Sequence, residues 1–227
     1  MDRNQLSSIL SGDGDIIKFK EHIGPLPDQE RVCFIEKCYG CTKPGELNML
    51  LTKVPHFKEM VVMAFNCDHC GFRSNEVKVV GVISTVGTKI TLQVQSSTDI
   101  HRDLLKSDSA TVYIPEIDLE ITEGSLGGRF TTIEGLLRTL RMQLSHMKGF
   151  NMSEDDFNVP KTAFGKFIQR LKDLESGEEN FTFIIDDPTS NSFIQNLYAP
   201  DDDPQLRIQE YKRTREQDDD LGLVSDV

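Results

Sequence analysis

Five cysteines lie within a 38-residue stretch of this 227-residue chain, and four of them form two Cys-x-x-Cys pairs. The first pair is Cys38 with Cys41 and the second is Cys67 with Cys70, with 25 residues between the pairs. A Cys-x-x-Cys turn directs two thiolates toward one ion, and two such turns on facing hairpins complete the tetrahedral four-sulfur site that structural zinc prefers. The sequence therefore predicts one structural zinc ion bound by these four cysteines.

Other uses of the cysteines fit the pattern less well. Disulfides need an oxidising compartment, and nothing in the sequence suggests secretion. A thioredoxin-type redox site needs one pair that opens a helix, and a catalytic zinc site usually keeps three protein ligands and an open position. His69 lies inside the second pair but is surplus to a complete four-sulfur site, so we expect it to be exposed. Cys33 is expected in the core of a strand.

The cysteine pairs require tight turns between strands. Gly40 lies inside the first pair and Gly71 directly follows the second, and glycine adopts the positive φ values that let a backbone curl around sulfur. Between the pairs, residues 47–51 and 59–65 are rich in apolar side chains and are predicted to be two strands. Residues 31–76 are therefore predicted to form a zinc ribbon, after a flexible arm or linker over residues 1–30.

The chain is predicted to continue as strands after the ribbon. In residues 89–95 apolar side chains alternate strictly with polar ones, which predicts a strand with one buried face. Residues 112–121 also alternate, but the phase slips by one residue at Pro115-Glu116, where a bulge or corner would keep the same face buried. Corners of this kind favour a β-sandwich or a barrel-like roll over a flat sheet.

The hydrophobic period then changes to that of helices. Thr131 and Glu134 have the spacing of a capping box, and the apolar residues that follow fall on one helical face. A second helix is predicted to begin at Ser153 and to end near Gly177. Because residues 181–185 form another β run, the two helices are predicted to be a hairpin at about residues 131–176, inserted in a roll that spans residues 77–200.

Charge is distributed unevenly along the chain. The 25 Lys and Arg residues against 37 Asp and Glu residues give a net charge of −12, and 11 acidic against 4 basic residues lie after Ile185. Residues 201–227 are therefore predicted to be an acidic C-terminal segment. A chain this acidic is a poor candidate for binding nucleic acid or an anionic membrane, and no apolar run approaches the roughly 20 residues that span a bilayer.

Motifs of common enzymes are absent from the sequence. Neither Gly-x4-Gly-Lys-Ser/Thr nor Gly-x-Gly-x-x-Gly occurs, and residues 124–128 lack the Gly-x-Ser-x-Gly spacing of a nucleophile elbow. Asp186 and Asp187 precede Pro188, which predicts a capped turn, with a hard-cation site as the alternative. We therefore expect that the protein is not an enzyme.

Several motifs in combination resemble the ZPR-type zinc-finger protein family. The resemblance covers roughly residues 30–223 and rests on residues 47–60, 67–77 (Cys-Asp-His-Cys-Gly-Phe-Arg-Ser-Asn-Glu-Val), 87–92 (Gly-Thr-Lys-Ile-Thr-Leu), 102–107, 127–137, 191–192, 198–205 and 211–214. Eukaryotic members generally carry two such modules in tandem. This chain has one, more similar to the second, and is either a piece of such a protein or a single-module relative. It departs from the family at Tyr39, where proline is usual, so the geometry of the first turn is in question.

The resemblance implies a mainly β fold with some α structure, in which a four-cysteine zinc ribbon precedes a double-stranded β-helix-like roll that carries the helical hairpin. It also implies a chaperone or adaptor that binds translation elongation factor one-alpha and assists its folding, in cytoplasm and nucleus. That factor is basic, so an acidic surface would favour association. Candidate contacts are Phe72 and Arg73 on the ribbon and Asp201, Asp202 and Asp203 in the acidic segment; alternatively, the acidic run only aids solubility.

Three other functions are weighed against this one. The resemblance also implies a signalling adaptor that binds receptor tyrosine kinase tails and moves to the nucleus with the survival-of-motor-neuron complex. A cupin-like metal-dependent enzyme would need two histidines and a carboxylate, but beyond His101-Arg102-Asp103 the sequence offers only His146, on a predicted helix. Nucleic-acid binding through the ribbon is disfavoured because residues 38–76 carry no net charge.

Overall fold

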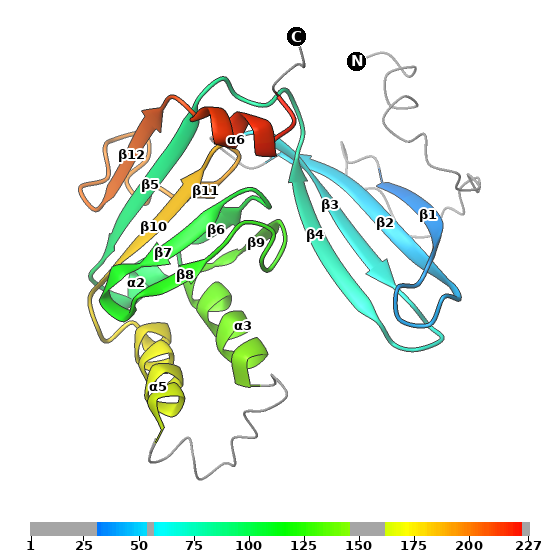
Figure 1. The fold of residues 1–227 in the computed structure, drawn as a ribbon, viewed down its shortest axis with the longest axis horizontal. Coiled ribbons are helices and arrows are strands. Elements are labelled where there is room, and N and C mark those ends of the chain that lie inside the picture. The colour runs from blue at the N-terminus through cyan, green and yellow to red at the C-terminus, as the bar shows by residue number, and fades with distance from the viewer. Residues whose placement is uncertain (1–30, 54–56, 146–161, 224–227) are drawn as a thin grey trace. The chain divides into compact units, whose positions relative to one another are not determined.

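The computed structural model describes residues 31–53, 57–145 and 162–223, and the chain divides into two compact units between Val80 and Gly81 (Figure 1). The predicted arm at residues 1–30 lies outside the described residues. The first unit is a single antiparallel sheet, and the second contains two sheets and the helices. The mainly β character predicted from the sequence is confirmed.

The first unit consists of β1 (Arg31–Lys37), β2 (Pro44–Lys53), β3 (Glu59–Asn66) and β4 (Arg73–Val79), and each strand pairs with the next along the chain. Strands β2 and β3 confirm the two strands predicted between the cysteine pairs. Within the described residues of this unit, the buried apolar side chains other than cysteine are Met60, Phe65 and Val77. Such a small core predicts that the sheet needs a further source of stability, which a metal supplies in small domains.

Cys33 corrects one expectation from the sequence. It lies on a strand as predicted, but its side chain is exposed rather than in a core. Strand β1 is an edge strand of this sheet, and none of its seven residues is fully buried. The continuous apolar run at residues 32–35 therefore identified the strand correctly but not its exposure.

The second unit contains a five-stranded sheet in the order β12-β5-β10-β7-β8 and a three-stranded sheet in the order β11-β6-β9. Within the described residues these sheets do not join into a closed barrel. The arrangement confirms the roll predicted to follow the ribbon. Its strands are β5 (Gly87–Val94), β6 (Asp103–Lys106), β7 (Thr111–Ile114), β8 (Leu119–Ile121), β9 (Arg129–Thr132), β10 (Phe181–Asp187), β11 (Phe193–Ile194) and β12 (Leu206–Tyr211).

The core of the second unit is formed by alternate residues of its strands together with one face of each long helix. Strand β10 lies between β5 and β7, which confirms that the chain returns to the sheet after the helices. Burying one side chain such as Phe183, which is completely enclosed, contributes about 1.5–3 kcal/mol. The alternation predicted for residues 89–95 is confirmed, since Ile90, Leu92 and Val94 are buried.

The phase slip at Pro115 is a hairpin turn rather than the predicted bulge or corner of one strand. Strands β7 and β8 pair antiparallel and are joined by a single 3-10 turn, η1 (Pro115–Ile117), followed by Asp118 at φ 49°. Proline suits the first position of such a turn because its φ is fixed and it has no N–H to leave unpaired. Val112 faces Ile121 and Ile114 faces Leu119. The chain folds back at the turn, and the same four side chains therefore reach the core from two paired strands.

Helices α3 (Ile133–Ser145) and α5 (Ala163–Ser176) pack against each other and confirm the helical hairpin. The cap of α3 lies one residue later than predicted, because Thr132 rather than Thr131 accepts the N–H of Gly135, at 3.1 Å. The predicted start of the second helix at Ser153 lies outside the described residues. Its predicted end is confirmed by Gly177 at φ 70°. In the described part of the chain, no helix is both long and apolar enough to cross a membrane.

The segment after residue 200 contributes to the sheet and is more than an acidic tail. Strand β12 pairs with β5 along its whole length, and helix α6 (Arg215–Asp220) follows it. Tyr211 lies opposite Gly87, where an added Cβ would lie 2.4 Å from the tyrosine Cζ. The absence of a side chain at Gly87 therefore lets the Tyr211 ring lie on the backbone, where its hydroxyl donates to Asp186.

Candidate metal centre and partner surfaces

The four predicted zinc ligands converge at one end of the first unit. The Sγ atoms of Cys38 and Cys70 lie 3.6 Å apart, as do those of Cys41 and Cys67, and all four lie within 4.8 Å of one another. Four sulfurs bound tetrahedrally at about 2.3 Å from zinc would be about 3.8 Å apart. A disulfide would instead need about 2.05 Å. The four thiols fit one zinc ion. Each of the two short Sγ–Sγ distances joins one cysteine of the first Cys-x-x-Cys pair to one of the second.

Two equivalent turns present the cysteines. In the first, the N–H of Cys38 donates to Lys43 O and that of Thr42 donates to Cys38 O; in the second, Cys67 and Gly71 make the matching bonds. The residue after each pair has positive φ, 61° at Thr42 and 74° at Gly71. The prediction of positive φ is therefore confirmed for Gly71 and wrong for Gly40. The geometry of the first turn, which the sequence put in question at Tyr39, therefore matches that of the second.

The electrostatics of the thiols favours a bound cation. Burial opposes ionisation of Cys38, but the backbone N–H groups of Cys41 and Gly40 outweigh it and lower its pKa to about 7. At Cys70 the backbone N–H of Phe72 favours the thiolate, yet burial and the three neighbouring thiols raise its pKa to about 12. Four converging thiolates repel one another, so a divalent cation is what allows all of them to ionise together.

A small aromatic cluster supports the turns from beneath. Phe65, at the end of β3, is buried with Cys38 and Cys67, and its ring centroid lies 6.1 Å from that of Phe72. An added Cβ at Gly45 would lie 2.4 Å from Cζ of Phe65, so glycine is required for the ring to reach this position. The ring and the metal therefore fix the two turns jointly.

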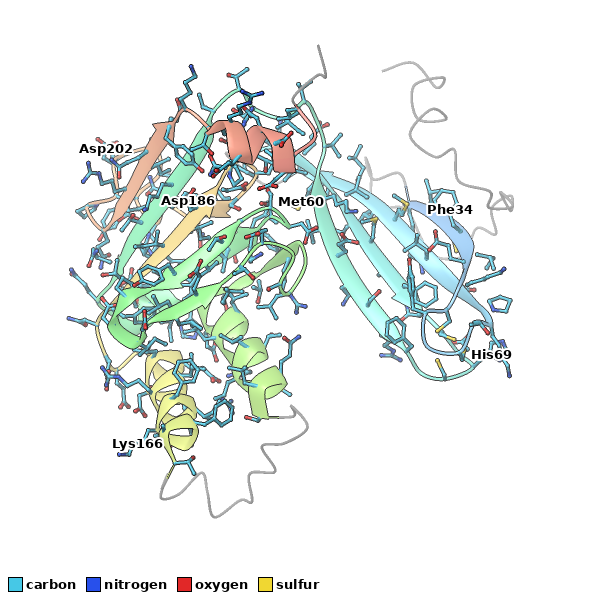
Figure 2. The ribbon with its side chains drawn as sticks, in the orientation of Figure 1. Phe34, Met60, His69, Lys166, Asp186 and Asp202 are labelled. Atoms are coloured by element: carbon cyan, nitrogen blue, oxygen red, sulfur yellow. The ribbon has the colours of Figure 1, made fainter. Side chains whose placement is uncertain are left out.

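The turns carry exposed side chains away from the metal. Tyr39 is 87% exposed and Phe72 is 37% exposed. His69 is exposed as predicted, and Figure 2 shows it beside the cysteine sulfurs at the tip of the first unit. Arg73, the first residue of β4, is also exposed. The sequence therefore placed Phe72 and Arg73 correctly at the surface, but it did not identify Tyr39 as part of the same tip.

The three aspartates predicted as a contact surface do not share one environment. Asp201 and Asp202 are exposed, whereas Asp203 is buried. The carboxylate of Asp203 accepts a hydrogen bond from Nη1 of Arg102, which is completely buried. Asp203 is thus enclosed by its own unit, and the accessible part of the predicted contact is Asp201 with Asp202.

Arg102 organises a buried polar network that the sequence did not reveal. Its Nε and Nη2 donate to Asp99 Oδ1 at 2.9 and 2.8 Å, and Nη2 also donates to Gln205 at 3.1 Å. Burial alone would raise the pKa of Asp99 and of Asp203, but hydrogen bonds and the charge of Arg102 hold both pKa values below 3.8. The one signal of this network in the sequence is the position of Arg102 between the apolar residues Ile100 and Leu104, which are both buried.

Asp187 closes the turn after β10, as the sequence predicted. Its buried carboxylate accepts hydrogen bonds from the backbone N–H groups of Thr189 and Asn191 and from the hydroxyls of Ser107, Ser109, Thr189 and Ser192. These bonds overcome the effect of burial and lower the pKa of Asp187. Among the described residues, the four cysteines are the one group of three or more His, Cys, Asp or Glu side chains whose ligand atoms converge.

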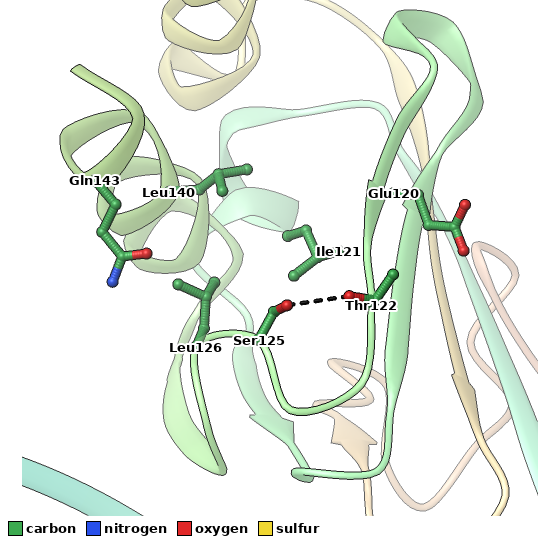
Figure 3. Close-up of a pocket in the computed structure, with 7 residues that line it drawn as sticks. All are labelled: Glu120, Ile121, Thr122, Ser125, Leu126, Leu140 and Gln143. Atoms are coloured by element: carbon green, nitrogen blue, oxygen red, sulfur yellow. Dashed lines mark hydrogen bonds between the residues drawn. The ribbon is translucent and has the colours of Figure 1, made fainter. Parts of the chain in front are cut away.

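The second unit has an open hollow of about 340 Å³ between β8, the following loop and α3 (Figure 3). The hydroxyls of Thr122 and Ser125 hydrogen-bond to each other there at 3.1 Å, and no histidine lines the hollow. At the His101-Arg102-Asp103 sequence, His101 Nδ1 bonds Ser97 O at 2.5 Å and Arg102 belongs to the buried network. His146 lies outside the described residues. The ligand set of a cupin-like site is therefore not assembled in the described part of the chain.

The fold and the metal site together define a zinc-ribbon protein in which a complete four-cysteine site precedes a jelly roll. Family models support this division: the ZPR1 zinc-finger domain matches residues 31–85, and the ZPR1 jelly-roll domain matches residues 98–223. The chain belongs to the ZPR1 zinc-finger protein family.

Curated relatives are similar over most of this chain. The human zinc finger protein ZPR1 is 42% identical over 190 residues, and the Schizosaccharomyces pombe zinc finger chaperone zpr1 is 44% identical over 191. Each alignment covers 84% of this chain but 41% of the relative, so the chain spans about two fifths of their length. A ZPR1-like protein of Methanocaldococcus jannaschii is 28% identical over 142 residues, which are 62% of this chain and 69% of that protein.

Proposed function

We propose that this chain is a non-enzymatic module that binds translation elongation factor one-alpha and assists its folding, in the cytoplasm and with access to the nucleus. The observation that carries the proposal is the complete four-sulfur site. Cys38 and Cys67 are almost fully enclosed, and four protein ligands leave no open position at which zinc could activate a substrate. A metal held in this way supports structure. Here it supports the two cysteine turns at the tip of the first unit, which expose Tyr39, Phe72 and Arg73.

The tip provides a surface suited to a protein partner. Tyr39 and Phe72 expose aromatic area at low conformational cost, because the zinc-bound turns already fix their backbones. Arg73 lies next to Phe72 and adds a charged group that can form directed hydrogen bonds. Aromatic residues and arginine are the types most enriched at the centres of protein interfaces. These three residues are the ribbon's proposed contact with the client.

Two further points support the elongation factor as the client. The S. pombe relative is itself named a chaperone, and the family resemblance implies that the client is this factor. The net charge of −12 complements a basic protein, which accelerates association and discriminates against acidic partners. The same charge makes the proposed binding sensitive to salt.

The test uses the full chain with purified elongation factor one-alpha. We expect capture at low salt that weakens at high salt, and a higher yield of active factor after refolding in the presence of the zinc-loaded chain. Tyr39→Ser with Arg73→Ser should reduce capture while zinc content stays at one per chain, because neither side chain belongs to the aromatic cluster that supports the turns. Tyr113→Ser, at an exposed tyrosine of the second unit, is the matched control and should bind as the unchanged protein does.

Two results would contradict the proposal. One is the absence of capture at any salt concentration. The other is capture that is insensitive both to salt and to the paired tip substitutions. Capture of receptor tyrosine kinase tails without capture of the elongation factor would instead favour the signalling-adaptor alternative.

A further inference from the structure

The loop between β11 and β12 is held at both ends by one buried side chain. Arg102 Nη1 donates to the carbonyl of Gln195 at 3.0 Å and to the carboxylate of Asp203, while Nη2 donates to the side chain of Gln205 at 3.1 Å. Gln195 and Gln205 mark the two ends of the loop, so we name residues 195–205 the Arg102-anchored loop. Both ends of the loop therefore hydrogen-bond to the same buried side chain and lie close together, as do the ends of a compact Ω-loop.

The interior of the loop is also ordered by its own hydrogen bonds. The amide of Asn196 bridges it, since Nδ2 donates to Asp201 O at 2.9 Å and Oδ1 accepts the N–H of Tyr198 at 2.7 Å. The N–H of Asp201 donates to Tyr198 O at 2.8 Å. These bonds use backbone groups and the Asn196 side chain. They leave the side chains of the loop's outer residues available.

The outer residues form a continuous exposed surface of two chemical kinds. All six residues from 197 to 202 are exposed. The first four are apolar or aromatic, with Leu197 41% and Tyr198 51% exposed, and the last two are Asp201 and Asp202. Figure 2 shows Asp202 at the periphery of the second unit, beside β12. In the described part of the chain, the carboxylates of Asp201 and Asp202 form no hydrogen bond or ion pair.

This combination is suited to recognition rather than to stability. An exposed leucine and tyrosine contribute little to the core of their own unit, and two adjacent carboxylates without a partner among the described residues repel each other. A loop already held in one conformation loses little entropy when it binds. Tyrosine gives a partner both an apolar face and a hydroxyl, while the two carboxylates require a cationic counterpart.

We propose that the Arg102-anchored loop is a docking surface for a basic segment of a protein client, with an apolar side chain of that segment packing on Leu197 and Tyr198 and its Lys or Arg residues pairing with Asp201 and Asp202. The inference rests on the proposed function, in that the client is a basic protein. It adds a second contact in the other unit. Two separate contacts on one chain raise the effective affinity for a client that can reach both.

The test measures the affinity of the full zinc-loaded chain for elongation factor one-alpha at fixed salt. Leu197→Ser with Tyr198→Ser, and separately Asp201→Asn with Asp202→Asn, should each weaken binding about tenfold, as expected for the loss of central interface contacts. The matched controls are Ile208→Ser, at a residue 61% exposed, and Asp219→Asn with Asp220→Asn, at an exposed acidic pair of α6. Each control changes the same chemistry elsewhere in the unit. Ile208→Ser should leave the affinity unchanged, and the α6 pair, which removes the same net charge as the loop pair, should weaken binding far less than the loop pair does. The thermal midpoints of all variants should match.

The outcomes separate the loop from the proposed function. If the unchanged chain binds the factor and the loop variants bind as tightly as the controls, the loop proposal is overturned and the proposed function stands. If the unchanged chain does not bind the factor, the proposed function fails, and the loop is judged by NMR titration with a synthetic peptide of alternating lysine and leucine. Shifts centred on residues 197–202 would support the docking surface; shifts centred on residues 218–220, or none, would overturn it.

Discussion

Replacing Arg102 by methionine tests the buried network most directly. The substitution preserves much of the side-chain volume but removes a guanidinium that makes five hydrogen bonds, to Asp99, Gln195, Asp203 and Gln205. Both carboxylates are about 1% exposed and would be left without a cation. Breaking a buried ion pair by removing one partner costs about 3–5 kcal/mol. Because a unit of this size shifts by about 2–4 °C per kcal/mol, the thermal midpoint should fall by about 6–20 °C.

The pH dependence of the stability lost in Arg102→Met provides a second test of the buried ion pairs. In the unchanged protein the pKa values of Asp99 and Asp203 are held below 3.8, so their stabilising contribution is present above that value and is lost as pH falls through the folded-state pKa. Without Arg102, burial raises both pKa values, and protonation at acid pH relieves the buried charges. The difference in stability between the two proteins should therefore be largest near neutral pH and should shrink as the pH falls toward 4.

Urea unfolding followed by circular dichroism at several pH values is the assay, with Arg138→Met as the matched control. Arg138 also binds two carboxylates, Glu134 and Glu175, but its side chain is 53% exposed, so its removal should cost less than about 1 kcal/mol. Adding Asp99→Asn and Asp203→Asn to the Arg102 variant should recover part of the loss, since no buried charge then remains. If Arg102→Met loses no more stability than Arg138→Met, or if its loss of stability is independent of pH, the buried ion pairs do not stabilise the second unit as we infer.

Three further substitutions test local features of the fold. Cys67→Ser with Cys70→Ser should abolish the single bound zinc and unfold the first unit, and zinc still present by metal analysis would contradict the site. Gly87→Ala should cost about 1–3 kcal/mol in urea unfolding, because its Cβ would lie 2.4 Å from Cζ of Tyr211; combined with Tyr211→Ala it should add little further cost. Thr132→Ala should cost about 1 kcal/mol through loss of the helix cap, and an unchanged midpoint would exclude that cap.

Features set by neighbouring residues could be predicted from the sequence. The four-sulfur site follows from the spacing of two turns, and the strand at residues 89–95 follows from its alternation. Errors arose where two local structures satisfy the same pattern. A bulge and a hairpin at Pro115 both bury Val112 and Ile121, and adjacent threonines offer the same hydroxyl to the first turn of α3, so only the backbone path decides between them.

The buried network could not be predicted because, apart from the local pair of Asp99 and Arg102, its members are brought together by the tertiary fold. Arg102 and Asp203 are separated by 101 positions, and in the sequence Asp203 is one member of an acidic run whose other two members are exposed. The exposure of Cys33 has a similar origin, since an apolar strand pattern does not show that the strand lies at a sheet edge. Knowing which element covers which requires the three-dimensional arrangement.

The acidic residues of the chain divide into two roles, and this division predicts the kinetics of partner binding. Among the described residues, the buried acids Asp99, Asp187 and Asp203 are nearly balanced by the buried bases Arg102 and Lys106, so the acid excess remains at the surface, where it steers a basic partner. Asp201→Asn with Asp202→Asn should therefore act partly through the association rate and reduce its salt dependence. Leu197→Ser with Tyr198→Ser should instead raise the dissociation rate, because these side chains contribute packing and no charge. Stopped-flow association at two salt concentrations distinguishes the two effects, and identical kinetic changes in both variants would show that the loop does not combine the two kinds of contact.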